Sequence, residues 1–420
     1  AFLAQLRMEW LQQMRRPIIW FCLIAYFALA FFDTVQSGWS ATGNIWINGA
    51  DMILRRALIY SIIGTIAAAA IVSEPMCRDR QSRSQGLVLL AGTNRWVLGG
   101  GRFLAAFFVV LLTAMMFVPG VILGSFVSGT PAEQVGPFVP GHYANAFVQY
   151  VLPNFLITSA LIYAVAARTQ SQTAAFSVSI GYLALWILTR MMLGQDILRH
   201  DVFTKYALMD PYASIASNEF TCGWTNLEKN TTFPPFAGLL VWNRLLWISV
   251  SLGLIALGTL GIPWRLDSRK TRNGSAAVEF NLSDSSDKSD PSDSPISVAT
   301  GQATFTTQLG QMIVWELRDI WRTPGVRIMF AFAALTLWWS AASAVTHQFS
   351  LPSTDLLVHN AGFYFDKILV LVAIWGAANL MWREQSVGVS ELFDVQPTSD
   401  GARFLSKTIA LVAIVLAFWL

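Results

Sequence analysis

The side chains best suited to specific chemistry lie in two short charged segments far apart in the chain. The first begins with Arg78 and Asp79, and the second begins 305 positions later with Arg383 and Glu384. Such base–acid pairs can set the register of a bound protein, while a neighbouring apolar edge supplies a buried anchor. We therefore expect both segments to dock onto a partner protein. The segments span 77–91 and 382–396, and their other candidate contacts are Arg83, Leu87, Leu90, Glu391, Leu392 and Phe393.

Motifs for catalysis, cofactors or metals are absent from the sequence. It contains no G-x-x-x-x-G-K-[ST] loop to cradle phosphates and no H-E-x-x-H zinc motif. The four histidines show no metal-ligand spacing, and the three cysteines form neither a C-x-x-C motif nor an even disulfide set. We expect neither an enzyme activity nor a bound cofactor in this chain.

A second repeated pattern, Glu-x5-Arg-x-Pro, precedes two long apolar runs. It predicts short amphipathic helices over 2–16 and 305–323, lying flat on a membrane surface. The proline ends each helix, because the residue before proline is pushed out of helical geometry. The two copies, 307 positions apart, are Glu9, Arg15 and Pro17, then Glu316, Arg322 and Pro324.

The faces of the first surface helix follow from helical spacing. We expect its apolar residues to share one face and its polar residues mostly to point away from that face. The apolar set is Leu3, Leu6, Trp10 and Met14, and the polar set is Gln5, Glu9, Gln12, Gln13 and Arg16.

The composition is that of a membrane protein. Hydrophobic residues make up 54% of the chain and charged residues 13%, and the mean hydropathy is +0.50. A net charge of +3 gives no reason to expect a nucleic-acid partner.

A helix needs about 20 apolar residues to cross a bilayer. The predicted spans are 18–34, 57–76, 103–127, 147–167, 173–194, 237–262, 326–345, 362–382 and an incomplete 407–420.

The distribution of arginine and lysine sets the orientation. These residues gather before the first span, between the second and third, and after the sixth, so the positive-inside rule makes that side cytoplasmic. The opposite side holds the loops 35–56, 128–146 and 195–236, with Arg55, Arg56, Arg190 and Arg199 as exceptions. Six spans return the chain to the cytoplasm, so the two halves enter the membrane in the same direction, as parallel repeats.

A polar segment, 265–304, separates the two halves. It is rich in serine and aspartate and punctuated by proline, so we expect a disordered cytoplasmic linker. The first half is then 1–264 and the second 305–420. The chain begins without methionine and stops inside an apolar run, so we expect it to be a fragment with a truncated second half.

With these features the chain resembles the type-2 ABC exporter permeases over essentially its whole length. That family has an elbow helix before each half, six spans per half, and a coupling helix between the second and third spans. The closest resemblance is to long bacterial permeases fused to a C-terminal zinc aminopeptidase, of which no part is present here. It rests on Gly136-Pro137-Phe138, Leu152-Pro153-Asn154, Asp210-Pro211-Tyr212, Trp224-Thr225-x-x-Glu228-x-Asn230 and Asn243-Arg244-Leu245-Leu246-Trp247.

The resemblance implies an all-α, polytopic protein of the bacterial inner membrane, built from two parallel copies of the permease fold. Six spans belong to the first copy and three to the truncated second. It also implies a separate nucleotide-binding ABC ATPase, which would bind ATP and Mg²⁺, as the partner of the coupling segments.

Two other functions are weighed against an ATP-driven exporter. A secondary transporter would bind its substrate near the membrane midplane through intramembrane charges. Such charges are scarce, since Glu74 and Arg190 lie near span ends and Arg244 near the outer interface. A membrane anchor for an extracytoplasmic peptidase would not need two matched cytoplasmic docking segments. The sequence therefore favours the exporter.

Overall fold

The computed structural model forms two compact units, Ala1–Trp264 and Arg265–Leu420. The boundary coincides with the predicted end of the first half. The predicted linker 265–304 and the second docking segment 382–396 lie outside the described residues. The residues that the structure describes are 2–39, 45–82, 84–90, 94–127, 129, 132–193, 207–262, 305–322, 327, 330, 334, 373, 376, 380 and 400–419.

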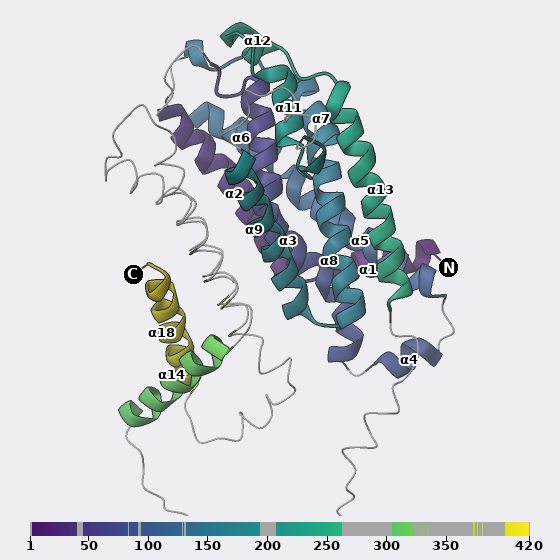
Figure 1. Ribbon diagram of the computed structural model, residues 1–420, viewed down its shortest axis with the longest axis vertical. Helices are drawn as coiled ribbons and strands as arrows, with labels where there is room; N and C mark the ends of the chain where they lie inside the picture. Colours follow the sequence, from purple (N-terminus) through teal and green to yellow (C-terminus); the bar gives the residue numbers. More distant parts are fainter. Residues whose placement is uncertain are drawn as a thin grey trace, which may run out of the picture. The chain divides into compact units, whose positions relative to one another are not determined.

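The first unit is a bundle of long helices, and its described residues contain no β-strand (Figure 1). Within the described ranges, five helical stretches are long and apolar enough to cross a membrane, which agrees with the prediction of an all-α membrane protein. They are α2 (Pro17–Trp39), α3 (Ala50–Gln81), α5 (Arg95–Met115) continued by α6 (Phe117–Val127), α7 (Pro140–Ala146) continued through the π-helical turn η2 (Phe147–Val151) into α8 (Leu152–Thr169), and α13 (Gly238–Leu260). A further helix, α9 (Gln172–Leu193), contains nearly all of the predicted span 173–194.

Helix α3 extends well beyond the predicted span 57–76. Its 32 residues correspond to about 48 Å of helix, against a hydrocarbon core of about 30 Å. The extra turns at its two ends carry Arg56 and Arg78, whose side chains pair with Asp33 of α2 and Glu9 of α1. The helix can therefore continue past the apolar run without leaving these charges unpaired.

Small residues bring α2 and α6 into close contact. A Cβ on Gly120 would lie 2.7 Å from the Cβ of Ala30 and 2.8 Å from the carbonyl oxygen of Phe27, and Gly124 packs equally closely against Thr34. Gly120 and Gly124 form a G-x-x-x-G pair, the spacing that lets two membrane helices approach closely.

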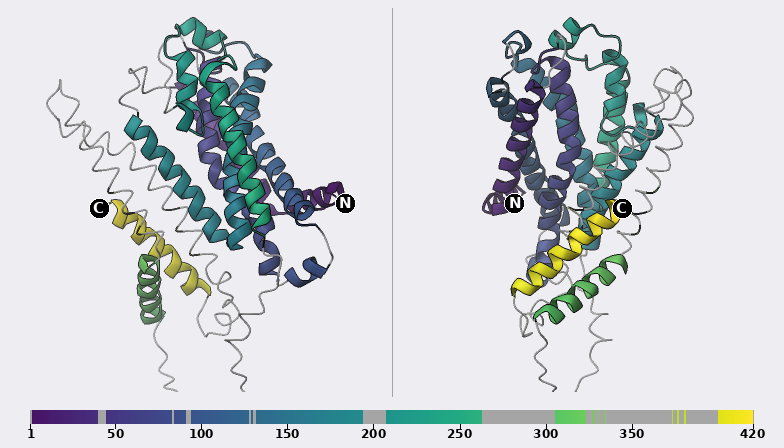
Figure 2. Two further views of the ribbon diagram at one scale, coloured as in Figure 1. Left: turned by 45° about the vertical axis from the view of Figure 1, so that its right-hand side comes forward. Right: turned by 90° about the vertical axis from the view of Figure 1, so that its left-hand side faces the viewer.

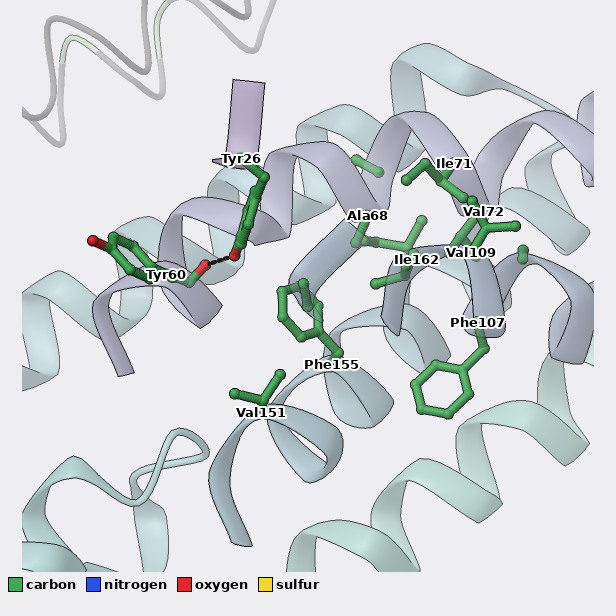
Figure 3. Close-up of a cluster of buried hydrophobic side chains, with 14 of the residues drawn as sticks. Tyr26, Tyr60, Ala68, Ile71, Val72, Phe107, Val109, Val151, Phe155 and Ile162 are labelled. Carbon is green, nitrogen blue, oxygen red and sulfur yellow. Dashed lines mark hydrogen bonds between the residues drawn. The ribbon is translucent and has the colours of Figure 1, made fainter. Parts of the chain in front are cut away.

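The core of the bundle is aromatic and aliphatic (Figure 3). Residues such as Ile71, Val109 and Phe155 come from α3, α5 and α8 and pack together. The Tyr26 hydroxyl of α2 donates a hydrogen bond to the carbonyl oxygen of Tyr60 in α3. This hydrogen bond satisfies a buried hydroxyl at the contact between α2 and α3.

Short elements occupy the two ends of the bundle. Helix α4 (Gln85–Leu90) follows α3 at one end, and α11 (Ser214–Thr221) and α12 (Asn226–Thr231) lie at the other (Figure 1). We call these the α4 end and the α12 end. Helix α1 (Phe2–Met14) runs across the direction of the long helices and packs against α5 (Figure 2).

Helix α12 carries a complete capping box. The Thr225 hydroxyl accepts from the backbone N–H of Glu228, while the Glu228 carboxylate accepts from the Thr225 N–H at 2.7 Å and from its hydroxyl at 2.8 Å. These hydrogen bonds, chiefly the backbone one, lower the pKa of Glu228. The predicted outer loop 195–236 is therefore helical in part of its described portion.

In the second unit, α14 (Phe305–Arg322) and α18 (Asp400–Trp419) pack against each other. Helix α14 matches the predicted surface helix 305–323, and α18 contains most of the predicted span 407–420. Pro324 and most residues of the predicted spans 326–345 and 362–382 lie outside the described residues.

Candidate functional site

Four charged side chains from three helices, three of them buried and Arg78 partly buried, form one connected group near the α4 end. Arg78 of α3 donates from Nη2 to both carboxylate oxygens of Glu9 in α1, each at 3.0 Å. Arg102 of α5 donates from Nε to Glu9 Oε1 at 3.1 Å. The Nη2 of Arg102 lies 2.8 Å from Asp79 Oδ2. We call Glu9, Arg78, Asp79 and Arg102 the ionic cluster.

The ionic cluster is balanced in charge and well enclosed. Glu9 is completely buried, and Arg102 and Asp79 are nearly so. The Glu9 carboxylate also accepts a hydrogen bond of 2.9 Å from Gln5 Nε2 on the preceding turn of α1. Removal of one partner from such a group leaves an uncompensated buried charge, which costs far more than the loss of a surface ion pair.

The ionic cluster also joins the two helices, α3 and α5, between which the loop with α4 lies. Asp79 lies in the last turn of α3, and Arg102 lies two turns into α5, on the far side of α4. Their ion pair therefore joins the two helices that flank α4. At the tip of this loop Leu87 and Leu90 are 72% and 84% exposed. An apolar edge of this kind, on a firmly held loop, is suited to contact with another protein.

The structure changes the roles expected for Arg78 and Asp79. Both were expected to meet a docking partner, but both point into the bundle, because Glu9 and Arg102 lie within ion-pair distance of them. Their charges stabilise the chain's own fold. Arg83 and the counterparts in the second segment, namely Arg383, Glu384, Glu391, Leu392 and Phe393, lie outside the described residues.

The face predicted for the first surface helix is wrong in part. Glu9 and Gln13 are fully buried, although both were expected to point away from the apolar face of the helix, while Leu3 of that apolar face is 77% exposed. The reason is that the side of α1 facing the protein meets arginines of α3 and α5, and charged partners outweigh apolar contact there. The exposed side retains Leu3, Met8 and Leu11, which suits contact with lipid.

The other residues of the two surface-helix patterns have distinct positions. Arg15 is exposed between α1 and α2. Pro17 is the first residue of α2, where its missing N–H costs nothing. In the second unit Glu316 is 3% exposed on α14, and Arg322 is the last residue of that helix. The glutamate of the pattern is thus buried in both copies.

A second buried polar group surrounds Arg244, toward the α12 end, and sequence reasoning did not select it as a site. The guanidinium donates from Nη1 to Asn154 Oδ1 at 2.9 Å and from Nη2 to the carbonyl oxygen of Tyr212 at 3.2 Å. It lies 5.2 Å from the ring centroid of Tyr150. These contacts hold a buried cation with neutral acceptors from α8 and from the segment before α11.

The neighbouring Asn243 and Asp210 complete this group. Asn243 Nδ2 lies 2.7 Å from the carbonyl oxygens of both Ala207 and Asp210. The Asp210 carboxylate accepts from Ser214 Oγ at 2.6 Å and from the backbone N–H of Ile215 at 2.9 Å. The group therefore fastens the segment 207–215 onto α8 and α13.

The side chain of Tyr212 attaches the same segment to α3. Its hydroxyl lies 2.8 Å from Thr65 Oγ1 of α3. Burial raises the pKa of the Tyr212 phenol above its ordinary value, so the phenol remains neutral and serves as a hydrogen-bonding group. The motifs containing Asn154, Tyr212 and Arg244 were visible in the sequence, but only folding brings them together.

The remaining motif residues tie loops together at the α12 end. Asn48 Nδ2 donates to the Gly136 carbonyl oxygen, and the Gly136 N–H donates to Asn48 Oδ1, both at 2.7 Å. Asn230 Oδ1 accepts from the backbone N–H of Trp46 at 2.8 Å. Among the described residues, no group of three or more His, Cys, Asp or Glu side chains is arranged to hold a metal ion. The motifs act here as structural ties.

No family model, curated protein or solved structure matches the chain. Its function therefore has to be argued from its own residues and geometry. The feature best suited to a function is the exposed apolar edge of α4. The two helices that flank α4 are joined by the ion pair between Asp79 and Arg102.

Proposed function

We propose that this chain is the transmembrane permease subunit of a type-2 ABC exporter in a bacterial inner membrane. The observation that carries the proposal is the loop of α4, which presents Leu87 and Leu90 beyond the end of α3. A coupling helix needs an exposed apolar edge for its partner and a firm connection to the spans. The ion pair between Asp79 and Arg102 supplies that connection.

The energy for transport comes from a separate nucleotide-binding ATPase in this proposal. The chain has no phosphate-binding loop of its own, so ATP and Mg²⁺ are bound by the partner. A second coupling segment, 382–396, serves a second ATPase subunit. Six spans in the first half, and a second half parallel to it, complete the proposed architecture.

Contact with the ATPase is assigned to the apolar edge of α4. Leu87 and Leu90 are the buried anchors of the complex, since burying apolar side chains gives most of the affinity at such contacts. Arg80 is exposed at the end of α3, so its charge is accessible to a partner. Arg78 and Asp79 act indirectly, by keeping the α4 loop attached to α1 and α5.

The proposal predicts that charging the edge of α4 separates the permease from its ATPase. The double variant Leu87→Asp/Leu90→Asp is introduced into the full-length protein in its own organism, and the membrane complex is purified. We expect the amount of co-purified ATPase to fall by about tenfold or more, since losing two anchor residues costs at least 1.4 kcal/mol.

A matched control is available at the other end of the bundle. Leu227 is a 69% exposed leucine on the equally short helix α12, and Leu227→Asp should leave the bound ATPase unchanged. If the α4 variant retains wild-type ATPase, the coupling assignment is wrong. If no ATPase co-purifies with the wild-type protein, the exporter proposal fails, and a membrane anchor or a secondary transporter takes its place.

A further inference from the structure

A cavity of about 400 Å³ lies within the second unit, between α14 and α18. Most of its lining is apolar, and Trp321 and Phe330 form one wall, with ring centroids 4.9 Å apart and planes at 65°. This volume falls within the range of about 300–1,000 Å³ typical of small-molecule sites. The lining residues are Leu317, Arg318, Trp321, Arg322, Phe330, Ala413, Ile414 and Ala417.

Two of the lining residues are arginines on consecutive turns of α14. Arg318 and Arg322 are both exposed, and among the described residues neither guanidinium forms an ion pair. An apolar cavity with two available guanidinium groups at its edge is amphipathic. A ligand that matches both parts needs a hydrocarbon portion and an anionic group.

Comparison of the two copies of the internal repeat shows smaller side chains at the cavity in the second half. With the offset of 305 that aligns Arg102 with Lys407, Ala413 corresponds to Phe108, and Ala417 corresponds to Leu112. The first half thus has bulky side chains where the second half has alanines. On the surface helix, with the offset of 307, Arg318 takes the position of Leu11. Compared with the first half, the second half therefore has smaller side chains and one additional positive charge at the position of the cavity.

We infer that this cavity binds an anionic phospholipid, with one acyl chain between α14 and α18 and the phosphate on Arg318 and Arg322. Apolar walls favour hydrocarbon over water. Guanidinium groups match the geometry of phosphate oxygens and can bind them in bidentate fashion. Helix α14 is an amphipathic helix of the type that lies at a membrane surface, where anionic headgroups are concentrated.

Other occupants fit the cavity less well. Free phosphate would contact the two arginines but would leave the apolar walls facing water. A neutral lipid would fill the walls but would leave both guanidinium groups without a counter-charge. The combination of walls and charges thus favours an anionic lipid. This inference does not depend on the exporter proposal, because it rests only on the second unit.

The test is lipid retention by the full chain. The protein is purified in detergent, stripped of lipid, and supplied with phosphatidylglycerol or phosphatidylcholine of equal chain length, and bound lipid is counted by native mass spectrometry. We expect one phosphatidylglycerol to be retained in preference to phosphatidylcholine. Ala413→Phe, which restores the first-half residue and fills the cavity, should lower its occupancy by about tenfold.

Two further variants test separately the contributions of the apolar walls and of the arginine charges to lipid binding. Ala417→Leu fills the cavity from another position and should act like Ala413→Phe. Arg318→Gln/Arg322→Gln should remove the preference for phosphatidylglycerol while the cavity remains. Arg15→Gln, which alters the first-half counterpart of Arg322, serves as the charge control and should change nothing.

Three results would overturn the inference. Unchanged phosphatidylglycerol in both cavity-filling variants would show that the acyl chain lies elsewhere. Equal retention of phosphatidylcholine by the wild-type protein would show that the arginines do not select the headgroup. Displacement of phosphatidylglycerol by millimolar inorganic phosphate would show an anion site in which the hydrocarbon chain has no part.

Discussion

Glu9 and Arg102 lie 93 positions apart in the sequence, yet Glu9 Oε1 and Arg102 Nε are 3.1 Å apart in the structure. This contact fixes the surface helix α1 to the first turns of α5. Because Arg102 also pairs with Asp79, the same side chain joins α1, α3 and α5. A helix that the sequence describes only as lying on a membrane surface is thereby part of the helix bundle.

The first prediction concerns the ionic cluster. Glu9→Gln removes a carboxylate that forms ion pairs with both Arg78 and Arg102, so buried positive charge is left without compensation. We expect a loss of stability of about 3–5 kcal/mol, measured by denaturant unfolding of the purified protein in detergent. Glu133→Gln, at an exposed position, should have an effect of less than about 0.5 kcal/mol. Equal stabilities of the two variants would show that the cluster contributes little.

The second prediction concerns orientation. Cys222 is an exposed free cysteine at the α12 end, whereas Cys77 is buried and Cys22 is partly buried in α2. A membrane-impermeant maleimide should therefore label Cys222 in intact spheroplasts, since we propose that the α12 end faces outward. Cys222→Ser should abolish this labelling.

The opposite end provides the matched site. In the Cys222→Ser background, Leu87→Cys places a thiol at an exposed position on α4. This thiol should react only after the membrane has been broken. Labelling of position 87 in intact spheroplasts would reverse the orientation and would contradict a cytoplasmic coupling role for α4.

The third prediction concerns the contact between α2 and α6. In Gly120→Ala the new methyl group would lie 2.8 Å from the Phe27 carbonyl oxygen, and backbone cannot move aside as a side chain can. Overpacking should cost about 1–3 kcal/mol. Gly253→Ala, in α13 with nothing within 4 Å of the added Cβ, should be neutral or stabilising. Thermal unfolding in detergent distinguishes the two, and equal midpoints would show that α2 and α6 are not closely packed.

The fourth prediction concerns Arg244. Arg244→Lys keeps the charge but loses the planar fork that reaches Asn154 and the carbonyl oxygen of Tyr212 together. We expect a destabilisation of about 2–3 kcal/mol, since hydrogen bonds from charged donors are worth about 1.5–3 kcal/mol each. The segment 207–236 should also become sensitive to trypsin at Lys229 in spheroplasts.

Arg55→Lys is the control for this change. Arg55 forms an ion pair with Asp51 one turn away on the same helix, and its side chain is largely exposed, so the substitution should cost less than about 1 kcal/mol. Trypsin resistance of Arg244→Lys equal to that of Arg55→Lys would show that Arg244 does not hold the outer segment.

The sequence by itself determined the positions of the long helices among the described residues. The apolar runs 173–194 and 237–262 correspond to Gln172–Leu193 and Gly238–Leu260, and the predicted surface helices 2–16 and 305–323 correspond to α1 and α14. This agreement has a local cause, because the length of an apolar run and the spacing of polar residues act within a single helix.

Only the tertiary structure decided which charged residues are buried and which remain available. Helical spacing grouped Glu9 with Gln13 on a polar face, but it carried no information on whether that face meets water or the arginines of other helices. Likewise, the sequence predicted that Arg78 and Asp79 bind a partner protein. In the structure these two residues instead form ion pairs with Glu9 and Arg102. The cost of burying a charge depends on partners distant in sequence, and those partners are specified only when the helices pack together.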